Sequence, residues 1–230
     1  MREGWRTRIQ TRWLGRFGIA PLLVGIIVAG NPEVIDRIAV SVGYQAITES
    51  EIELAIRITS FINGDKPDLS PQSRRKAAER LADQMLIRNE MKLSRYPMPP
   101  RDEARPEIEE LARNRFGNNR AAFEKALQDY KITRDDLLDY FWWQSTFLRF
   151  VDVRFRPGVQ VTDEEMRDYF EHHILPLAKK ANPGQPVTFE EYRDRIEQTL
   201  VGQRVDQEIE RWLERARRRT QIVFREEAFK

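Results

Sequence analysis

The sequence predicts a mainly α protein whose several helices accompany a small two-stranded β ribbon that joins the N- and C-terminal segments. Threonine–x–x–glutamate pairs, which form capping boxes, recur where helices should begin. Between these starts and the next proline or glycine, apolar residues recur every three or four positions. Strand-like alternation is confined to two short segments at opposite ends. Because a lone strand is not stable, we expect these two segments to pair.

The composition narrows the possible chemistry. Of the 230 residues, 40% are hydrophobic and 33% are charged, which suits long helices with one solvated face. The chain has no cysteine, which excludes disulfides, thiolate catalysis and cysteine metal sites. The formal net charge is only +2, so there is no overall attraction to nucleic acid.

The first thirty residues differ from the rest. Five arginines precede an apolar run, residues 18–30, that ends in small residues, which is the pattern of a secretory signal peptide. The run is shorter than the roughly 20 residues that span a bilayer. A cleaved signal, an uncleaved inner-membrane anchor, a mitochondrial-type targeting helix and a cytosolic arm remain open. Cleavage would remove five Arg and one Glu and change the net charge from +2 to −2.

The first predicted elements follow Pro32. Ile38, Val40 and Val42 alternate with smaller or polar neighbours, which predicts a half-buried strand. After a turn at residues 43–45, Thr48 and Glu51 form a capping box for a helix that ends near Asn63–Gly64. A second helix begins at Ser70–Pro71 and ends near Tyr96, before a proline cluster.

The rest of the chain is predicted to be largely helical. Thr133 is the predicted cap of one helix, and capping boxes at Thr162 and Thr188 open two others. Prolines and a glycine indicate a loop over residues 176–187, and residues 221–224 form the second predicted strand. The predicted helices span about residues 101–115, 119–130, 133–156, 162–170 and 188–219.

Several segments, in this order and spacing, resemble the SurA-like family of periplasmic chaperones. The opening strand Asp36–Val42 and the capped start Ile47–Glu51 are similar to the first strand and helix of that family. The other similar segments are residues 81–90, 123–127, 130–132, 137–149, 159–166 and 189–224. The resemblance covers about residues 34–225.

The resemblance implies one helical chaperone domain over residues 31–230. Its N-terminal part would be residues 31–172, and its returning helix and strand residues 188–230. The family's parvulin prolyl-isomerase domain, of roughly 100 residues, has no counterpart, because only the linker 173–187 lies in its place. The resemblance therefore implies an exported, periplasmic protein that holds unfolded exported or outer-membrane polypeptides without ATP, cofactors or prolyl-isomerase activity.

The candidate client-binding residues are aromatic and methionine side chains. On the helix 133–156, apolar residues including Leu148 form a predicted core face. Trp142 instead shares a stripe with Asp139 and Thr146 that is predicted to be solvated, so another element covers this tryptophan or it is exposed for binding. Methionine suits adaptable binding because its side chain is flexible and polarizable. The candidates are Trp142, Trp143, Phe150, Met85, Met91 and Met98.

No catalytic or metal site is predicted. Neighbouring His172 and His173 would point about 100° apart on a helix, so they would not share an ion. Two other functions remain open, namely a helical adapter that docks onto one folded partner and a binder of nucleic acid or membranes that uses the N-terminal arginines and residues 215–219. A homodimer is also open. The expected partners are unfolded polypeptides and not nucleic acid, with membrane contact only through residues 1–30 if they stay uncleaved.

Overall fold

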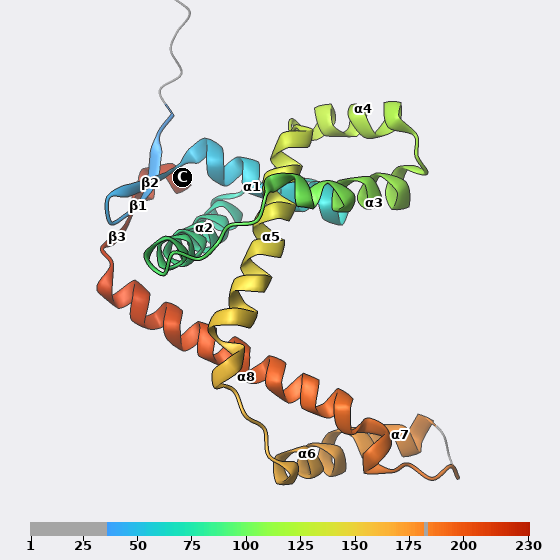
Figure 1. Cartoon of the computed structure of the whole chain (residues 1–230). Coiled ribbons are helices and arrows are strands. Elements are labelled where there is room, and N and C mark those ends of the chain that lie inside the picture. The colour runs from blue at the N-terminus through green and yellow to red at the C-terminus, as the bar shows by residue number, and fades with distance from the viewer. Residues whose placement is uncertain (1–35, 182–183) are drawn as a thin grey trace, which may run out of the picture. The chain divides into compact units, whose positions relative to one another are not determined.

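The computed structural model describes residues 36–181 and 184–230, so the predicted signal peptide or anchor lies outside the described residues. The described chain is mainly α, with a small three-stranded antiparallel sheet that links its N- and C-terminal parts (Figure 1). The strands are β1 (Ile38–Val42), β2 (Gln45–Thr48) and β3 (Ile222–Phe224). The helices are α1 (Glu49–Asn63), α2 (Pro71–Leu93), α3 (Arg105–Phe116), α4 (Arg120–Tyr130), α5 (Arg134–Arg154), α6 (Asp163–Tyr169), α7 (Leu175–Ala181) and α8 (Phe189–Arg219). Shorter helical turns are η1 (Arg101–Ala104), η2 (Arg156–Gly158), η3 (Phe170–Ile174, a π turn) and η4 (Glu226–Phe229).

The sheet pairs the two ends of the described chain, as predicted. β1 lies in the centre, and Val40 and Val42 are opposite Phe224 and Ile222 of β3. The ribbon nevertheless has three strands instead of two, because the segment after the turn returns along β1 as β2. Gly43 has a φ of 58°, a left-handed conformation that glycine adopts without strain and that allows this tight turn.

Most of the predicted helix starts are confirmed. Thr48 and Thr162 form capping boxes with Glu51 and Glu165, and Thr133 forms one with Asp136. The predicted capping box at Thr188 is wrong, because the Thr188 side chain makes no capping hydrogen bond although the residue is the N-cap of α8.

The predicted loop over residues 176–187 is wrong as far as Ala181. These residues form α7, which continues α6 through the π turn η3. Pro176 has no N–H to donate, so it removes one backbone hydrogen bond from this continuous helical run. The wider π turn directly before it lets the chain remain helical.

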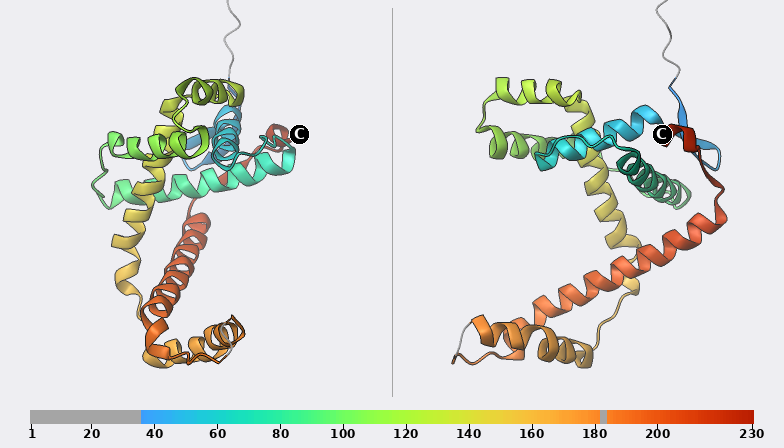
Figure 2. Two further views of the ribbon diagram at one scale, coloured as in Figure 1. Left: turned by 90° about the vertical axis from the view of Figure 1, so that its right-hand side faces the viewer. Right: turned by 180° about the vertical axis from the view of Figure 1, so that it is seen from behind.

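Three apolar clusters hold the described elements. The first joins the sheet, α1, α2, α5, the C-terminal half of α8 and η4, and the second joins α1, α3, α4 and α5. The third joins α6, η3 and the N-terminal half of α8, with Phe170 against Phe189. Helix α8 thus contributes to two clusters and carries the chain back to β3 (Figure 2). Within the described ranges, none of the helices combines the length and the apolar character that crossing a membrane requires.

Candidate functional site

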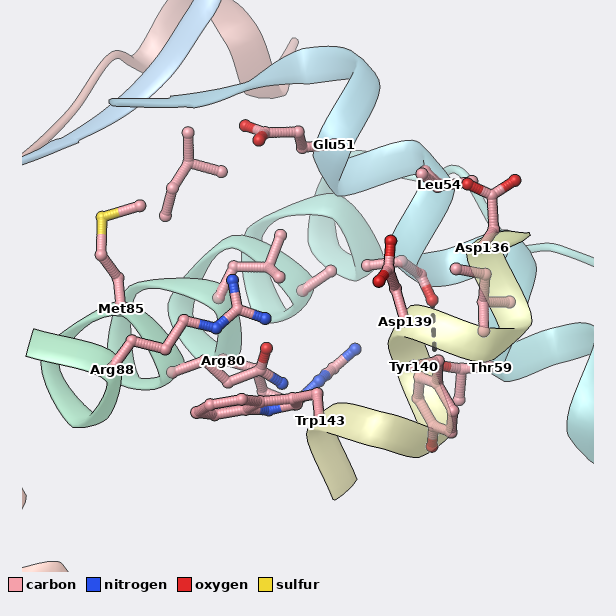
Figure 3. A pocket seen from close by; sticks show the side chains of 16 residues that line it. Glu51, Leu54, Thr59, Arg80, Met85, Arg88, Asp136, Asp139, Tyr140 and Trp143 are labelled. Atoms are coloured by element: carbon pink, nitrogen blue, oxygen red, sulfur yellow. Dashed lines mark hydrogen bonds between the residues drawn. The ribbon is translucent and has the colours of Figure 1, made fainter. Parts of the chain in front are cut away.

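A groove lies between α1, α2 and α5, and we call it the α1–α2–α5 groove. It consists of two neighbouring hollows that both involve Glu51, Leu54, Arg88 and Asp139. Side chains from all three helices project into the first hollow (Figure 3). Its apolar lining includes Ile47, Leu54, Leu81, Met85, Tyr140 and Trp143. The second hollow adds Met91, Tyr96, Met98 and Trp142.

The groove brings together five of the six predicted client-binding residues. Met85 and Trp143 line the first hollow, and Met91, Met98 and Trp142 line the second. Their exposure differs widely, because Trp143 and Met91 are buried and form the floor, whereas Met98 is 45% exposed. Of these residues, Met98 is therefore more accessible to a ligand than Trp143 and Met91.

Phe150 does not line the groove. It is buried in the first apolar cluster, where its ring packs edge-on against Tyr96 at 5.2 Å between centroids. A second edge-on contact, at 6.1 Å, joins it to Phe155. The structure therefore places Phe150 in the core, out of direct reach of a ligand.

Trp142 is covered by another element, which was one of the two alternatives for this residue. Its indole Nε1–H donates a hydrogen bond of 2.9 Å to the Pro99 carbonyl oxygen, and its ring remains partly exposed. The following turn η1 continues along the same stripe of α5, where Arg101 pairs with Asp139 at 2.5 Å and Glu103 with Arg149 at 2.7 Å.

Two expectations about the faces of α5 are therefore wrong. Thr146, on the stripe predicted to be solvated, is fully buried, whereas Leu148, on the predicted core face, is 61% exposed. The reason is that α5 packs into the second cluster near Leu137 and into the first cluster near Phe150, so its buried face changes along its length.

Arg88 lies where the two hollows of the groove meet. Its guanidinium lies over the Trp143 ring, 4.4 Å from the ring centroid, in a cation–π arrangement. Desolvation by the surrounding protein atoms lowers the pKa of Arg88, and the carboxylates of Asp139 and Glu51 oppose this shift. The residue as a whole is nevertheless exposed.

Tyr140 lies at the opposite wall, beside Thr59 of α1 (Figure 3). Burial raises the pKa of its phenol, and the positive charge of Arg80 opposes that shift. The phenol thus stays protonated at neutral pH and can donate a hydrogen bond to a ligand. The Thr59 hydroxyl is already used, because it donates to the Ala55 carbonyl oxygen at 2.9 Å.

Sequence reasoning missed the charged half of this groove. A signal was present, because Arg80, Gln84, Arg88 and Lys92 follow one another at four-residue spacing beside Leu81 and Met85. Residues four apart lie close together on a helix, so this series forms one inclined polar row next to an apolar one.

Several of the other charged features singled out in the sequence have partners within the described chain. His172 Nδ1 lies 2.9 Å from the Asp168 carbonyl oxygen, and this contact and the Asp168 carboxylate raise its pKa. His173 instead packs against the Tyr169 ring. Within residues 36–181 and 184–230, no three His, Asp or Glu side chains are grouped so that they could hold a metal ion. Arg217, in the cationic end of α8, donates to both carboxylate oxygens of Asp83 at 2.8 and 2.7 Å.

Comparison of the chain with family models, with curated proteins and with solved structures found no match.

Proposed function

We propose that this protein is an ATP-independent holding chaperone that binds unfolded exported or outer-membrane polypeptides in the α1–α2–α5 groove. We further propose that it is a SurA-like chaperone without prolyl-isomerase activity. The observation that carries the proposal is the composition of the groove, in which aromatic and methionine side chains alternate with charged ones at an open surface.

This composition suits a ligand without a fixed shape. The partly exposed ring of Trp142 provides apolar area, while Met85 and Met98 are flexible and polarizable and can adapt to different side chains. Tyr140 and Arg88 add hydrogen-bond donors that need no particular sequence. Each contact should be weak, because ordering an unfolded client costs conformational entropy.

Suppression of client aggregation tests the proposal. The purified full chain at molar excess should reduce light scattering by a chemically unfolded outer-membrane protein diluted into buffer. Leu54→Glu should weaken the suppression about tenfold in the concentration required, because it places a charge where both hollows meet. Thermal melting verifies that the variant is folded.

Leu177→Glu is the matched control. Leu177 of α7 is an exposed leucine outside the groove, whereas Leu54 is partly buried. Equal losses in the two variants would contradict the groove as the binding site. Failure of the native chain to suppress aggregation of any unfolded client would refute the chaperone function, and selective capture of one folded partner would support the adapter instead.

The fluorescence of Trp142 gives a second, independent measurement. With the other tryptophans replaced by phenylalanine, binding of an unfolded aromatic-rich peptide should shift the emission of the partly exposed Trp142 in a saturable way. A folded control protein should cause no shift. An unchanged emission at saturating peptide would place the binding site elsewhere.

A further inference from the structure

The groove is lined by four cationic side chains. Arg80, Arg88 and Lys92 lie at four- or eight-residue spacing along α2, and Arg95 follows the end of this helix. None of these four side chains makes a hydrogen bond or an ion pair with a residue of the described ranges. Arginine and lysine side chains carry only donors, so a partner for any of the four must supply acceptor oxygens.

The three carboxylates of the groove, in contrast, all have hydrogen-bond or ion-pair partners. Glu51 accepts a hydrogen bond of 2.8 Å from the Thr48 backbone N–H, within the capping box of α1. Asp136 accepts one of 2.7 Å from the Thr133 N–H in the same way. Asp139 is paired with Arg101, which does not line the groove. Among the described residues, the cationic side chains of the lining therefore have no acceptor, whereas each of its three carboxylates has a hydrogen-bond or ion-pair partner.

Arg88 is the best-placed donor. Its guanidinium lies over the Trp143 ring, and its N–H groups donate to no acceptor among residues 36–181 and 184–230. Glu51 and Asp139 face it and partly balance its charge, but neither carboxylate oxygen comes within ion-pair distance of it. A guanidinium in such a position can bind an incoming carboxylate through two parallel hydrogen bonds.

We infer that the groove selects polypeptide segments in which apolar side chains alternate with aspartate or glutamate. This inference rests on the proposed chaperone function and specifies its clients. The client carboxylates would pair with Arg88 and with the row of Arg80, Lys92 and Arg95. The client's apolar side chains would contact Leu54, Met85 and the partly exposed Trp142.

Three fluorescently labelled peptides test the inference. They share the same alternating leucine and phenylalanine residues and carry glutamate, glutamine or lysine at the positions between them. In low-salt buffer, anisotropy titrations of the full chain should show the glutamate peptide binding roughly tenfold more tightly than the glutamine peptide, and the lysine peptide binding least. The preference should shrink as salt screens the charges.

Variants connect the preference to Arg88. Arg88→Gln should reduce the glutamate preference to about twofold, and Arg88→Lys should retain part of it, since lysine keeps the charge but loses the stacked, two-pronged geometry. Arg113→Gln is the matched control, because Arg113 is an exposed arginine of α3 outside the groove. The control should leave all three affinities unchanged.

The outcomes separate the inference from the function on which it rests. Equal binding of all three peptides, with aggregation suppressed, would overturn the acidic preference and leave the chaperone function standing. Binding of none of the peptides, without suppression, would overturn both. Equal peptide binding combined with Arg88-dependent binding to vesicles of an anionic phospholipid would overturn the inference in favour of a lipid surface.

Discussion

At the residue scale, Thr146 is a buried polar residue on the stripe of α5 along which η1 lies. The residue is fully buried, and its hydroxyl oxygen has no hydrogen-bond partner among the described residues. An unpaired buried hydroxyl costs roughly 1–3 kcal/mol. The contacts of η1 and Pro99 with neighbouring α5 residues, such as the Trp142 hydrogen bond, offset this cost.

Thr146→Val should therefore stabilise the protein. Valine has nearly the same shape and removes the unpaired hydroxyl, so we expect the free energy of unfolding to rise by about 1 kcal/mol in urea denaturation. Thr146→Ser is the control, because it keeps the hydroxyl and deletes a buried methyl group. It should lower the same free energy by about 1 kcal/mol. A destabilising Thr146→Val would show that the hydroxyl is hydrogen-bonded in solution.

At the element scale, Glu165 connects α6 to α8. Its carboxylate accepts the Thr162 backbone N–H at 2.8 Å and pairs with Arg204 of α8. The Thr162 backbone bond and the Arg204 side chain lower the pKa of Glu165 below its usual value of about 4.5. A lowered pKa in the folded state means that ionised Glu165 stabilises the fold above pH 4.5 and loses this effect as the pH falls through the folded-state pKa.

Glu165→Gln should accordingly destabilise the contact between α6 and α8 at pH 7. Thermal melting from pH 7 to pH 3 should show the difference from the native chain narrowing as the pH falls below the usual value of about 4.5, because the stabilisation by ionised Glu165 is lost as the pH approaches the folded-state pKa. Glu164→Gln is the control, because this exposed neighbour shares the first turn of α6 without the Thr162 bond. A difference that persists unchanged at pH 3 would contradict this role of the charge.

At the scale of the whole described chain, the sheet and η4 connect segments that are far apart in sequence. Phe229 is buried in the first cluster and contacts the Phe224 ring at 6.2 Å between centroids. The Arg75 guanidinium of α2 lies over both rings and pairs with Glu226 at 2.8 Å. The C-terminal turn η4 thereby stabilises the position of β3 against both α2 and β1.

Phe229→Ala should loosen this closure. Removal of a buried phenylalanine side chain costs about 3–5 kcal/mol, and we expect a loss at the lower end in denaturant unfolding, because η4 can partly collapse. Hydrogen exchange of the β1 amides should accelerate, since β1 lies between β2 and β3. Leu177→Ala, at an exposed leucine, should change stability by less than about 0.5 kcal/mol. Unchanged hydrogen exchange of the β1 amides in Phe229→Ala would show that η4 does not stabilise the sheet.

Local signals explain which features the sequence could predict. A capping box needs only four consecutive residues, so the starts at Thr48 and Thr162 are confirmed without reference to the rest of the chain. The strand at residues 38–42 is confirmed for the same reason. The loop predicted from residue 176 is wrong because the helix continues past Pro176 through a π turn, and no local sequence pattern predicted that turn.

The sequence by itself determined the mainly α character, most helix starts and the aromatic and methionine candidates, because propensity, capping and periodicity act over a few neighbouring residues. Only the tertiary structure decided that five candidates line one groove, that Phe150 lies in the core and that Arg88 stacks on Trp143. These outcomes depend on which distant segment packs on which face. On α5, the first and second apolar clusters and the turn η1 together decide which side chains are buried.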